Sequence, residues 1–388
     1  GAAQSENDPC LFIVKMDMIP ILMVATHVDD LVQAGRADTI KHFQNHMDKK
    51  FKVVHEGMLR YVLGMEVVRD RSNGTVSIVQ RKYSIDVVKR FGLEHCNPKA
   101  IPLPGGFKLQ AKSESDETSD APYRQAVGSV MYLATCTRPD LAYAMCVLTR
   151  RFDSPTAATW AATKMVLKYI SGTPTRGLVY HTRDGTELKA YVDSDWAGDE
   201  ETRRSTTGYV ILFCGGPIAW RSGLQKSVST SSTEAEYIAL AECVKEVIYL
   251  RRIAGEMGCA QHGPTEVFVD NEAAIKLAMN QYGGRRTRHI ELQWHFARSK
   301  VLSGEIKLTK IGTHDNPADA FTKALPAPVF CRHMFAMLGA GMGRGRPGKE
   351  GVENPWTPLP HVDLTEGSIS DTNTTDMGES SRYVWREE

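Results

Sequence analysis

Two stretches with the alternating pattern of a β-strand end on aspartates, and they constrain the fold of this chain more than any other feature. In "ELKAYVD" the period-2 pattern of a strand places Leu188 and Val192 on one face and Asp193 at the strand's end. The string "TEVFVDNE" repeats the arrangement and ends on Asp270. Buried like charges repel each other and lose their hydration. Strands that end in this way therefore predict a cation that binds the acids and offsets both costs.

Two more acids stand at the starts of predicted helices. The string "STSSTEAEYIAL" opens a long helix from Thr233 to Met257, in which Glu236 lies one turn before Leu240 of the apolar stripe. Asp319 opens a last short helix after an Asn-Pro pair. Taken singly, each acid is explained as a capping, first-turn or turn residue. Their regular order along the chain, strand, helix, strand, helix, favours one shared site instead.

Such a cluster of carboxylates is typical of metal-ion catalysis on phosphodiesters. Carboxylate oxygens suit Mg²⁺, and two-metal sites clamp the attacking and the leaving oxygen of an in-line displacement. The sequence therefore predicts two Mg²⁺ ions, with Mn²⁺ as a substitute, held by four acids: Asp193, Glu236, Asp270 and Asp319. An acidic Ca²⁺ site is a weaker alternative, because the sequence has no 12-residue loop with ligands at alternate positions.

The elements around these acids follow an α/β order. Three strands, a helix, a strand, a helix, a strand and a helix succeed one another from about residue 186. Residues 123–172 have helical periodicity in three pieces, separated by "TRPD" and "DSPT". Residues 11–35 are predicted to form two short strands around a turn, with Asp29 and Asp30 between apolar runs. Beyond residue 339 the Gly/Pro-rich and then acidic composition predicts disorder.

Composition sets broad limits on the kind of protein. A chain of 388 residues predicts two or three domains, and its formal net charge of +1 means that any nucleic-acid surface is a local patch. Eight scattered cysteines predict reduced thiols in a cytoplasmic or nuclear setting. The apolar stretches are too short or too interrupted for a membrane span. Because the chain starts on Gly1 without a signal sequence, we expect it to be part of a larger protein.

At the four acids, the sequence resembles the ribonuclease H domain of copia-type LTR retrotransposon polyproteins. The matching strings include "YVDSDWAGD", "STSSTEAEYIAL", "VDNEAAIKLA", "RTRHIELQWHFAR" and "GTHDNPADAFTKAL". Upstream, "HVDDL", "LGMEVVRD", "YRQAVGSVMYLATCTRPDLAYA" and "VLKYISGTPTRGLVY" resemble the reverse transcriptase portion and its connection to ribonuclease H. The resemblance covers residues 1 to 326 and is specific because many strings occur in order.

The resemblance implies a fold and a division of the chain. It implies an α/β, ribonuclease H-like domain at residues 186–326, with a mixed five-stranded sheet and flanking helices. A partial reverse transcriptase palm at 1–80 and a helical thumb or connection at 81–185 would precede it, with the disordered tail at 340–388. We expect the fingers and the first palm strand, with a third metal-binding aspartate, to lie before Gly1, so that polymerase activity is not expected of this fragment.

The resemblance also implies an activity and its residues. The family's four metal-binding acids fall on the four acids named above, which would cleave the RNA strand of RNA-DNA hybrids by two-metal hydrolysis. His314 takes the place of a mobile histidine that helps product leave, and Asp29 and Asp30 match the paired aspartates that hold Mg²⁺ at a primer end. Implied partners are the hybrid and the upstream fingers and palm of the parent polyprotein, and virus-like particles are one implied location.

Basic residues outside the acid cluster are candidates for contact with the hybrid. In "GGRRTRH", Arg285, Arg286 and Arg288 are placed to track phosphates, with a solvated loop as the alternative. A second candidate set is Trp220, Arg221 and Lys226, although a tryptophan is more often a core or edge residue. Recognition through 2′-hydroxyls predicts weak sequence preference.

A second function stays open at this point. A decayed or domesticated retroelement fragment would bind nucleic acid or a protein partner without turnover. The complete set of four acids favours an enzyme, whereas the truncated palm favours decay. The sequence carries no sign of the oligomeric state.

Overall fold

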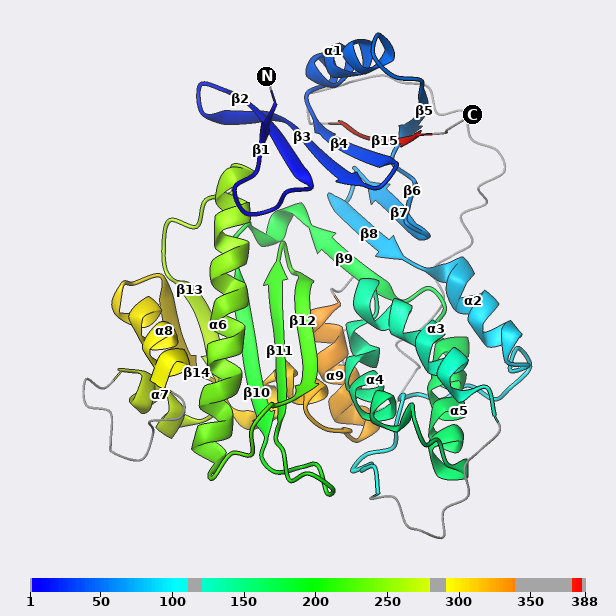
Figure 1. Cartoon of the computed structure of the whole chain (residues 1–388), viewed down its shortest axis with the longest axis vertical. Helices are drawn as coiled ribbons and strands as arrows, with labels where there is room; N and C mark the ends of the chain where they lie inside the picture. The colour runs from blue at the N-terminus through cyan, green and yellow to red at the C-terminus, as the bar shows by residue number, and fades with distance from the viewer. Residues whose placement is uncertain (1, 111–120, 280–290, 339–378, 386–388) are drawn as a thin grey trace. The chain divides into compact units, whose positions relative to one another are not determined.

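The computed structural model describes residues 2–110, 121–279, 291–338 and 379–385 (Figure 1). The chain divides into two compact units. The first consists of Gly1–Val68, Tyr249–His262 and Lys349–Glu388, and the second of Arg69–Ile248 and Gly263–Gly348. The finer domain boundaries predicted from the sequence, near residues 80, 185 and 326, stay predictions.

An antiparallel sheet with the strand order β1-β2-β3-β4-β15-β5 forms the first unit. Leu22, Val24 and Leu31 from its strands pack with Ile40 of helix α1 in a small apolar core. The elements of this unit are β1 (Ala3–Gln4), β2 (Leu11–Met16), β3 (Ile19–His27), β4 (Asp30–Gly35), α1 (Ala37–Asp48), β5 (Val53–Met58), β6 (Tyr61–Val62) and the start of β7 (Met65–Asp70).

Strand β15 (Glu379–Trp385) departs from the disorder predicted for residues 340–388. It pairs antiparallel with both β4 and β5. The string "RYVW" is rich in the aromatic and β-branched residues that favour strands, which gives a local reason for the difference. The rest of the predicted tail, residues 340–378 and 386–388, lies outside the described residues.

The predicted three helices of residues 123–172 are confirmed as α3 (Tyr123–Cys136), α4 (Ala142–Leu148) and α5 (Ala157–Gly172). The string "DSPT" ends in Thr156, the N-cap of α5. Its hydroxyl accepts from the Thr159 N–H and the Thr159 hydroxyl accepts from the Thr156 N–H, so the two form a capping box. Helix α2 (Arg81–Arg90) precedes this group, and strands β8 (Thr75–Val79) and β9 (Gly177–His181) pair antiparallel.

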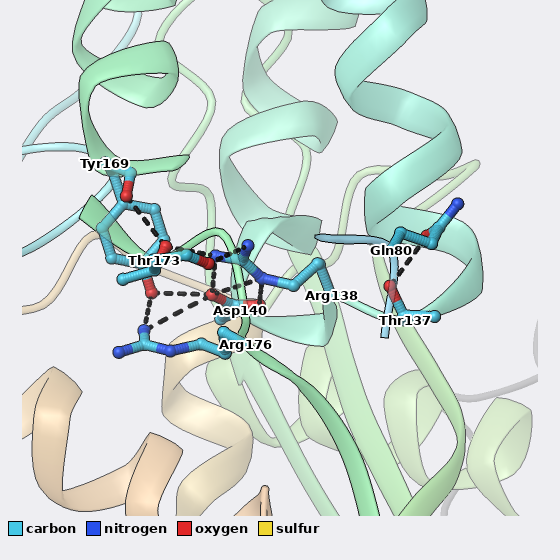
Figure 2. A network of polar contacts seen from close by, with 7 residues as sticks. All are labelled: Gln80, Thr137, Arg138, Asp140, Tyr169, Thr173 and Arg176. Carbon is cyan, nitrogen blue, oxygen red and sulfur yellow. Dashed lines mark hydrogen bonds and ion pairs between the residues drawn. The ribbon is translucent and has the colours of Figure 1, made fainter. Parts of the chain in front are cut away.

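The other string that separates these helices, "TRPD", builds a buried ionic network (Figure 2). Arg138 donates to both oxygens of Asp140 at 2.8–3.2 Å and to the carbonyl oxygen of Thr173 at 3.0 Å. The hydroxyl of Tyr169 donates to Asp140 at 2.6 Å, and Arg176 lies 3.6 Å from the same carboxylate. The side chains of Arg138 and Asp140 are fully buried, so this network joins the α3–α4 junction to α5 and the start of β9.

A mixed five-stranded sheet with the order β12-β11-β10-β13-β14 completes the second unit. Strands β10, β11 and β12 are antiparallel, whereas β10, β13 and β14 are parallel. Parallel neighbours need a crossover, which helices supply after β12 and after β13. The elements are β10 (Lys189–Asp195), β11 (Thr206–Phe213), β12 (Gly216–Leu224), α6 (Ser232–Glu256) up to Ile248, β13 (Thr265–Val269), α7 (Glu272–Met279), α8 (Glu291–Leu302), β14 (Ile306–Lys310), the short 3-10 helices η5 (Thr313–Asp315) and η6 (Pro317–Phe321), and α9 (Ala327–Met337).

This topology confirms the predicted ribonuclease H-like α/β fold. The strand that carries Asp193 lies at the centre of the sheet, next to the strand that leads to Asp270. The apolar stripe predicted for α6 is buried throughout: Tyr237, Leu240, Ala241, Val244, Val247 and Ile248. No helix among the described residues is long and apolar enough to cross a membrane.

Candidate metal centre

The register of the two central parallel strands brings Asp193 and Asp270 together. Tyr191 pairs with Phe268 across β10 and β13, and their rings stack with centroids 4.8 Å apart and planes at 14°. Side chains two residues further along each strand lie on the same face. Asp193 and Asp270 therefore leave the sheet side by side, as the alternating patterns predict.

Glu236 enters the same region from the first turns of α6. The side chain of Gln225, itself buried, holds the start of this helix: its amide donates to the carbonyl oxygen of Ala235 at 2.8 Å and to the hydroxyl of Thr207 at 3.2 Å. Thr207 lies on β11 and pairs with Ser194 of β10. Gln225 thus ties the residue before Glu236 to the strands beside Asp193.

Asp193, Glu236 and Asp270 form a compact carboxylate triad. Each offers one carboxylate oxygen, and these three atoms lie within 4.8 Å of one another. Asp193 and Glu236 are 2% and 6% exposed, and Asp270 is half-buried. The Oε2 atom of Glu236 is buried and has no hydrogen-bond partner among the described residues. Burial, and then the charges of Asp193 and Asp270, raise the pKa of Glu236 well above its ordinary value.

Asp319 lies beside this triad, on η6. Asn316 caps η6 by accepting the N–H of Ala318 at 3.1 Å, and its side-chain amide donates to the carbonyl oxygen of Val192 at 2.9 Å. Burial, followed by the charge of Asp193, raises the pKa of Asp319 to about 7. The four predicted acids thus converge, three of them in the triad and the fourth next to Asp193.

Two residues that follow Asp319 also bind the acids. The hydroxyl of Thr322 donates to Oδ2 of Asp193. The ammonium of Lys323 lies 3.1 Å from Oδ1 of Asp319 and 3.9 Å from Oδ2 of Asp193. Burial raises the pKa of Asp193, while Lys323 and Thr322 act against that shift.

The residues fit the divalent cations that the sequence predicts. Hard carboxylate oxygens at close range are the ligands that Mg²⁺ prefers, and the unpaired oxygen of Glu236 is available to a cation. Buried acids with raised pKa values would also gain most from a divalent cation, because it removes their mutual repulsion. The part of the chain that the structure describes holds one such group of three acids.

The other predicted metal and catalytic residues are His314 of the second unit and Asp29 and Asp30 of the first. His314 is exposed on η5, and its carbonyl oxygen accepts a hydrogen bond from Arg332. In the first unit, Asp29 is exposed in the two-residue turn between β3 and β4, and Asp30 is half-buried opposite His27. The roles of these residues stay predictions.

The predicted nucleic-acid contacts have mixed positions. Trp220 is half-buried on β12 and donates its indole N–H to the carbonyl oxygen of Ala134 at 2.8 Å, the structural role named as its alternative. Arg221 is exposed 3.3 Å from Glu242, and Lys226 is exposed. The loop arginines Arg285, Arg286 and Arg288 lie outside the described residues. None of these contacts with nucleic acid is tested by the structure.

Sequence reasoning missed three residues of the site. The position of Lys323 could have been predicted from the sequence, because it stands four residues after Asp319, a spacing at which acidic and basic side chains pair on a helix. Thr322 and Gln225 have no such pattern, because their partners lie beyond one helical turn or strand pair: Thr322 binds Asp193, and Gln225 binds Thr207 and Ala235. The acid Asp199, four residues after the end of β10, has its own counter-ion, because a guanidinium nitrogen of Arg150 lies 2.7 Å from its carboxylate.

The fold and the acids at its strand ends define the class of this molecule: a ribonuclease H-like α/β domain joined to reverse transcriptase sequence. A family model described as reverse transcriptase (RNA-dependent DNA polymerase) matches residues 4–104. The retrovirus-related Pol polyprotein from transposon TNT 1-94 of Nicotiana tabacum is 37% identical over 340 residues, which are 85% of this chain and 26% of that protein. An uncharacterized mitochondrial protein of Arabidopsis thaliana, AtMg00810, is 35% identical over 58% of this chain and 92% of its own length.

The chain belongs to the Pol polyprotein family of copia-type retrotransposons. It spans about a quarter of the length of the Pol polyproteins of Nicotiana tabacum and Arabidopsis thaliana that it matches. Among solved structures, LC11-RNase H1 in complex with RNA/DNA hybrid is 15% identical and covers 35% of this chain and 94% of that chain, with a TM-score of 0.27.

Proposed function

We propose that this chain is a ribonuclease that cleaves the RNA strand of RNA-DNA hybrids with the help of two Mg²⁺ ions. The observation that carries the proposal is the triad: three carboxylates from two strand ends and a helix, with oxygens within 4.8 Å of one another. Membership in a family of Pol polyproteins supports it.

The chain's own residues would hold and orient the metals. Asp193, Glu236 and Asp270 would supply the ligands of the triad, and Asp319 would add a carboxylate next to Asp193. When bound, the metal ions would supply an activated water and charge stabilisation at the leaving oxygen. Thr322 holds Oδ2 of Asp193, which fixes the orientation of that carboxylate. Because the pKa of Glu236 is raised well above its ordinary value, metal binding should release a proton.

We also propose the substrate, the partner and the cellular location of this activity. The substrate would be the hybrid formed during reverse transcription, and the parent polyprotein's fingers and palm would be the partner. In the parent protein, Asp29 and Asp30 would hold Mg²⁺ in the polymerase site, and His314 would assist product release. The proposed location is the cytoplasm or nucleus. All eight cysteines are free thiols, which supports a reducing compartment.

The direct test is cleavage of an RNA-DNA hybrid labelled on the RNA strand. Wild-type chain should cleave it when Mg²⁺ is present and should leave RNA-RNA and DNA-DNA duplexes intact. Asp270→Asn should lower the rate by at least about 100-fold, because even outer partners of metal sites contribute 10- to 100-fold. Asp153→Asn is the matched control, since the side chain of Asp153 is 99% exposed in an ion pair with Arg124.

Two results would oppose the proposal. Cleavage that Asp270→Asn leaves unchanged would come from another nuclease in the sample. Hybrid binding by the wild type without any Mg²⁺-dependent cleavage would favour the alternative, a domesticated fragment that binds nucleic acid without turnover.

A further inference from the structure

Lys323 contacts two of the four predicted metal ligands, Asp193 and Asp319. Its ammonium is 3.1 Å from Oδ1 of Asp319 and 3.9 Å from Oδ2 of Asp193. The side chains of these two acids are 8% and 3% exposed, whereas that of Lys323 is 39% exposed. The lysine therefore reaches from the surface onto two buried carboxylates.

The ammonium replaces part of the hydration that these acids lose. Two buried carboxylates side by side repel each other strongly unless a positive charge is near. Lys323 supplies that charge from the turn that follows Asp319, and its aliphatic chain lets the ammonium move without a change in the backbone. A divalent cation held by both Asp193 and Asp319 needs the same oxygens that the ammonium now contacts.

We propose that Lys323 is an internal counter-ion that neutralises Asp193 and Asp319 when no metal is bound and competes with one metal ion for them. The inference rests on the proposed metal site and names a regulator of its occupancy. Lys323 contacts Asp193 and Asp319, and no ion pair joins it to the described Glu236 or Asp270. The competition should therefore weaken the binding of an ion held by Asp193 and Asp319 more than the binding of an ion held mainly by Glu236 and Asp270.

The structure also offers the ammonium a second position. A cavity of about 50 Å³ is lined by Lys323 together with Tyr143, Arg150 and Asp195. Asp195 is half-buried and forms no hydrogen bond or ion pair with the described side chains, but its charge interacts with that of Lys323. On arrival of a cation at Asp193 and Asp319, the ammonium would turn towards Asp195.

The experiment counts bound Mn²⁺ by the electron paramagnetic resonance signal of the free ion, using the whole chain without nucleic acid. Wild type should show one tight and one weaker class of site. Lys323→Met keeps most of the length of the side chain and removes its charge. The weaker class should then tighten by about tenfold or more, because a like charge beside the ion is gone. Lys323→Arg keeps the charge and should keep the weaker class.

A matched control is Lys276→Met. Lys276 forms the same four-residue ion pair with Glu272 on α7, but both side chains are more than 60% exposed. This change should leave both classes of Mn²⁺ site as in the wild type. Without metal, Lys323→Met should lower the melting temperature more than Lys276→Met does, since only Lys323 neutralises buried acids.

The outcomes separate this inference from the proposed function. If the wild type binds Mn²⁺ in two classes and Lys323→Met leaves the weaker class unchanged or weaker, the counter-ion role is wrong and the metal site stands. If the wild type binds no Mn²⁺, the proposed metal site fails and the inference fails with it.

Discussion

Asn316 donates a hydrogen bond of 2.9 Å from its side-chain amide to the carbonyl oxygen of Val192, the residue before Asp193. The same side chain caps the helical turn that carries Asp319. One fully buried side chain therefore sets the distance between a strand end and a helix start that are 124 residues apart. The convergence of the acids depends on this kind of contact.

Asn316→Ala should weaken both the fold and the metal site. Loss of the cap costs about 1 kcal/mol, and a buried carbonyl without a partner costs about 1–3 kcal/mol, so the free energy of unfolding should fall by about 2–4 kcal/mol. Denaturant unfolding measures this loss. The rise in melting temperature with Mg²⁺ should also shrink, because Asp319 is no longer held beside Asp193.

Thr156→Ala is the control for that experiment. It removes the N-cap of α5, which has no contact with the acids, and should cost about 1 kcal/mol. The response to Mg²⁺ should stay as in the wild type. Equal losses of the Mg²⁺ response in the two variants would show that Asn316 acts on stability alone.

Asp140→Asn should be severely destabilising. Asp140 is fully buried between Arg138 and Arg176, and removing its charge leaves two buried guanidinium groups without their acid. Breaking a buried pair in this way costs about 3–5 kcal/mol. Denaturant unfolding measures the free energy of unfolding of Asp140→Asn, and Asp153→Asn, which changes an exposed ion pair, is the control. A loss no larger than that of Asp153→Asn would contradict a structural role for the network.

His333 should make the fold sensitive to acid. Burial, and then the charge of Arg332, lower the pKa of His333 to about 4, against the opposing effect of Asp315. The unfolded chain therefore binds the proton first, and stability should fall as the pH drops from about 6.5 towards 4. His333→Gln should flatten that part of the dependence of unfolding free energy on pH. His314→Gln, at an exposed histidine, should leave it unchanged.

Mg²⁺ should stabilise the protein more at pH 8 than at pH 6. With the pKa of Asp319 raised to about 7, the metal-free fold holds a proton that the unfolded chain releases. The stabilisation of the metal-free fold by this proton is complete below about pH 4 and is lost as the pH rises through about 7. Because Mg²⁺ binds the deprotonated acids, its effect should grow over the same range.

Melting temperatures with and without Mg²⁺ at the two pH values test this prediction. Asp270→Asn removes a triad ligand and should abolish the difference. A Mg²⁺ effect that is the same at pH 6 and pH 8 would mean that no proton leaves the site when the metal binds.

Local patterns in the sequence predicted much of the fold. The alternation in "ELKAYVD" and "TEVFVDNE" predicts strands β10 and β13 and the acids at their ends. The apolar stripe of α6 and the breaks at "TRPD" and "DSPT" predict the helices. These features depend on residues two to four apart, so the sequence by itself determined them.

Only the tertiary structure decided which distant groups meet. The parallel register that pairs Tyr191 with Phe268 sets Asp193 beside Asp270, and the cap at Asn316 adds Asp319. The hydrogen bond from Thr322 and the ammonium of Lys323 at the acids also depend on that packing. Periodicity in the sequence predicts which face of a strand or helix a side chain occupies. Its partner on that face depends on the strand register and on the need of buried charges for a counter-ion, which are properties of the tertiary structure.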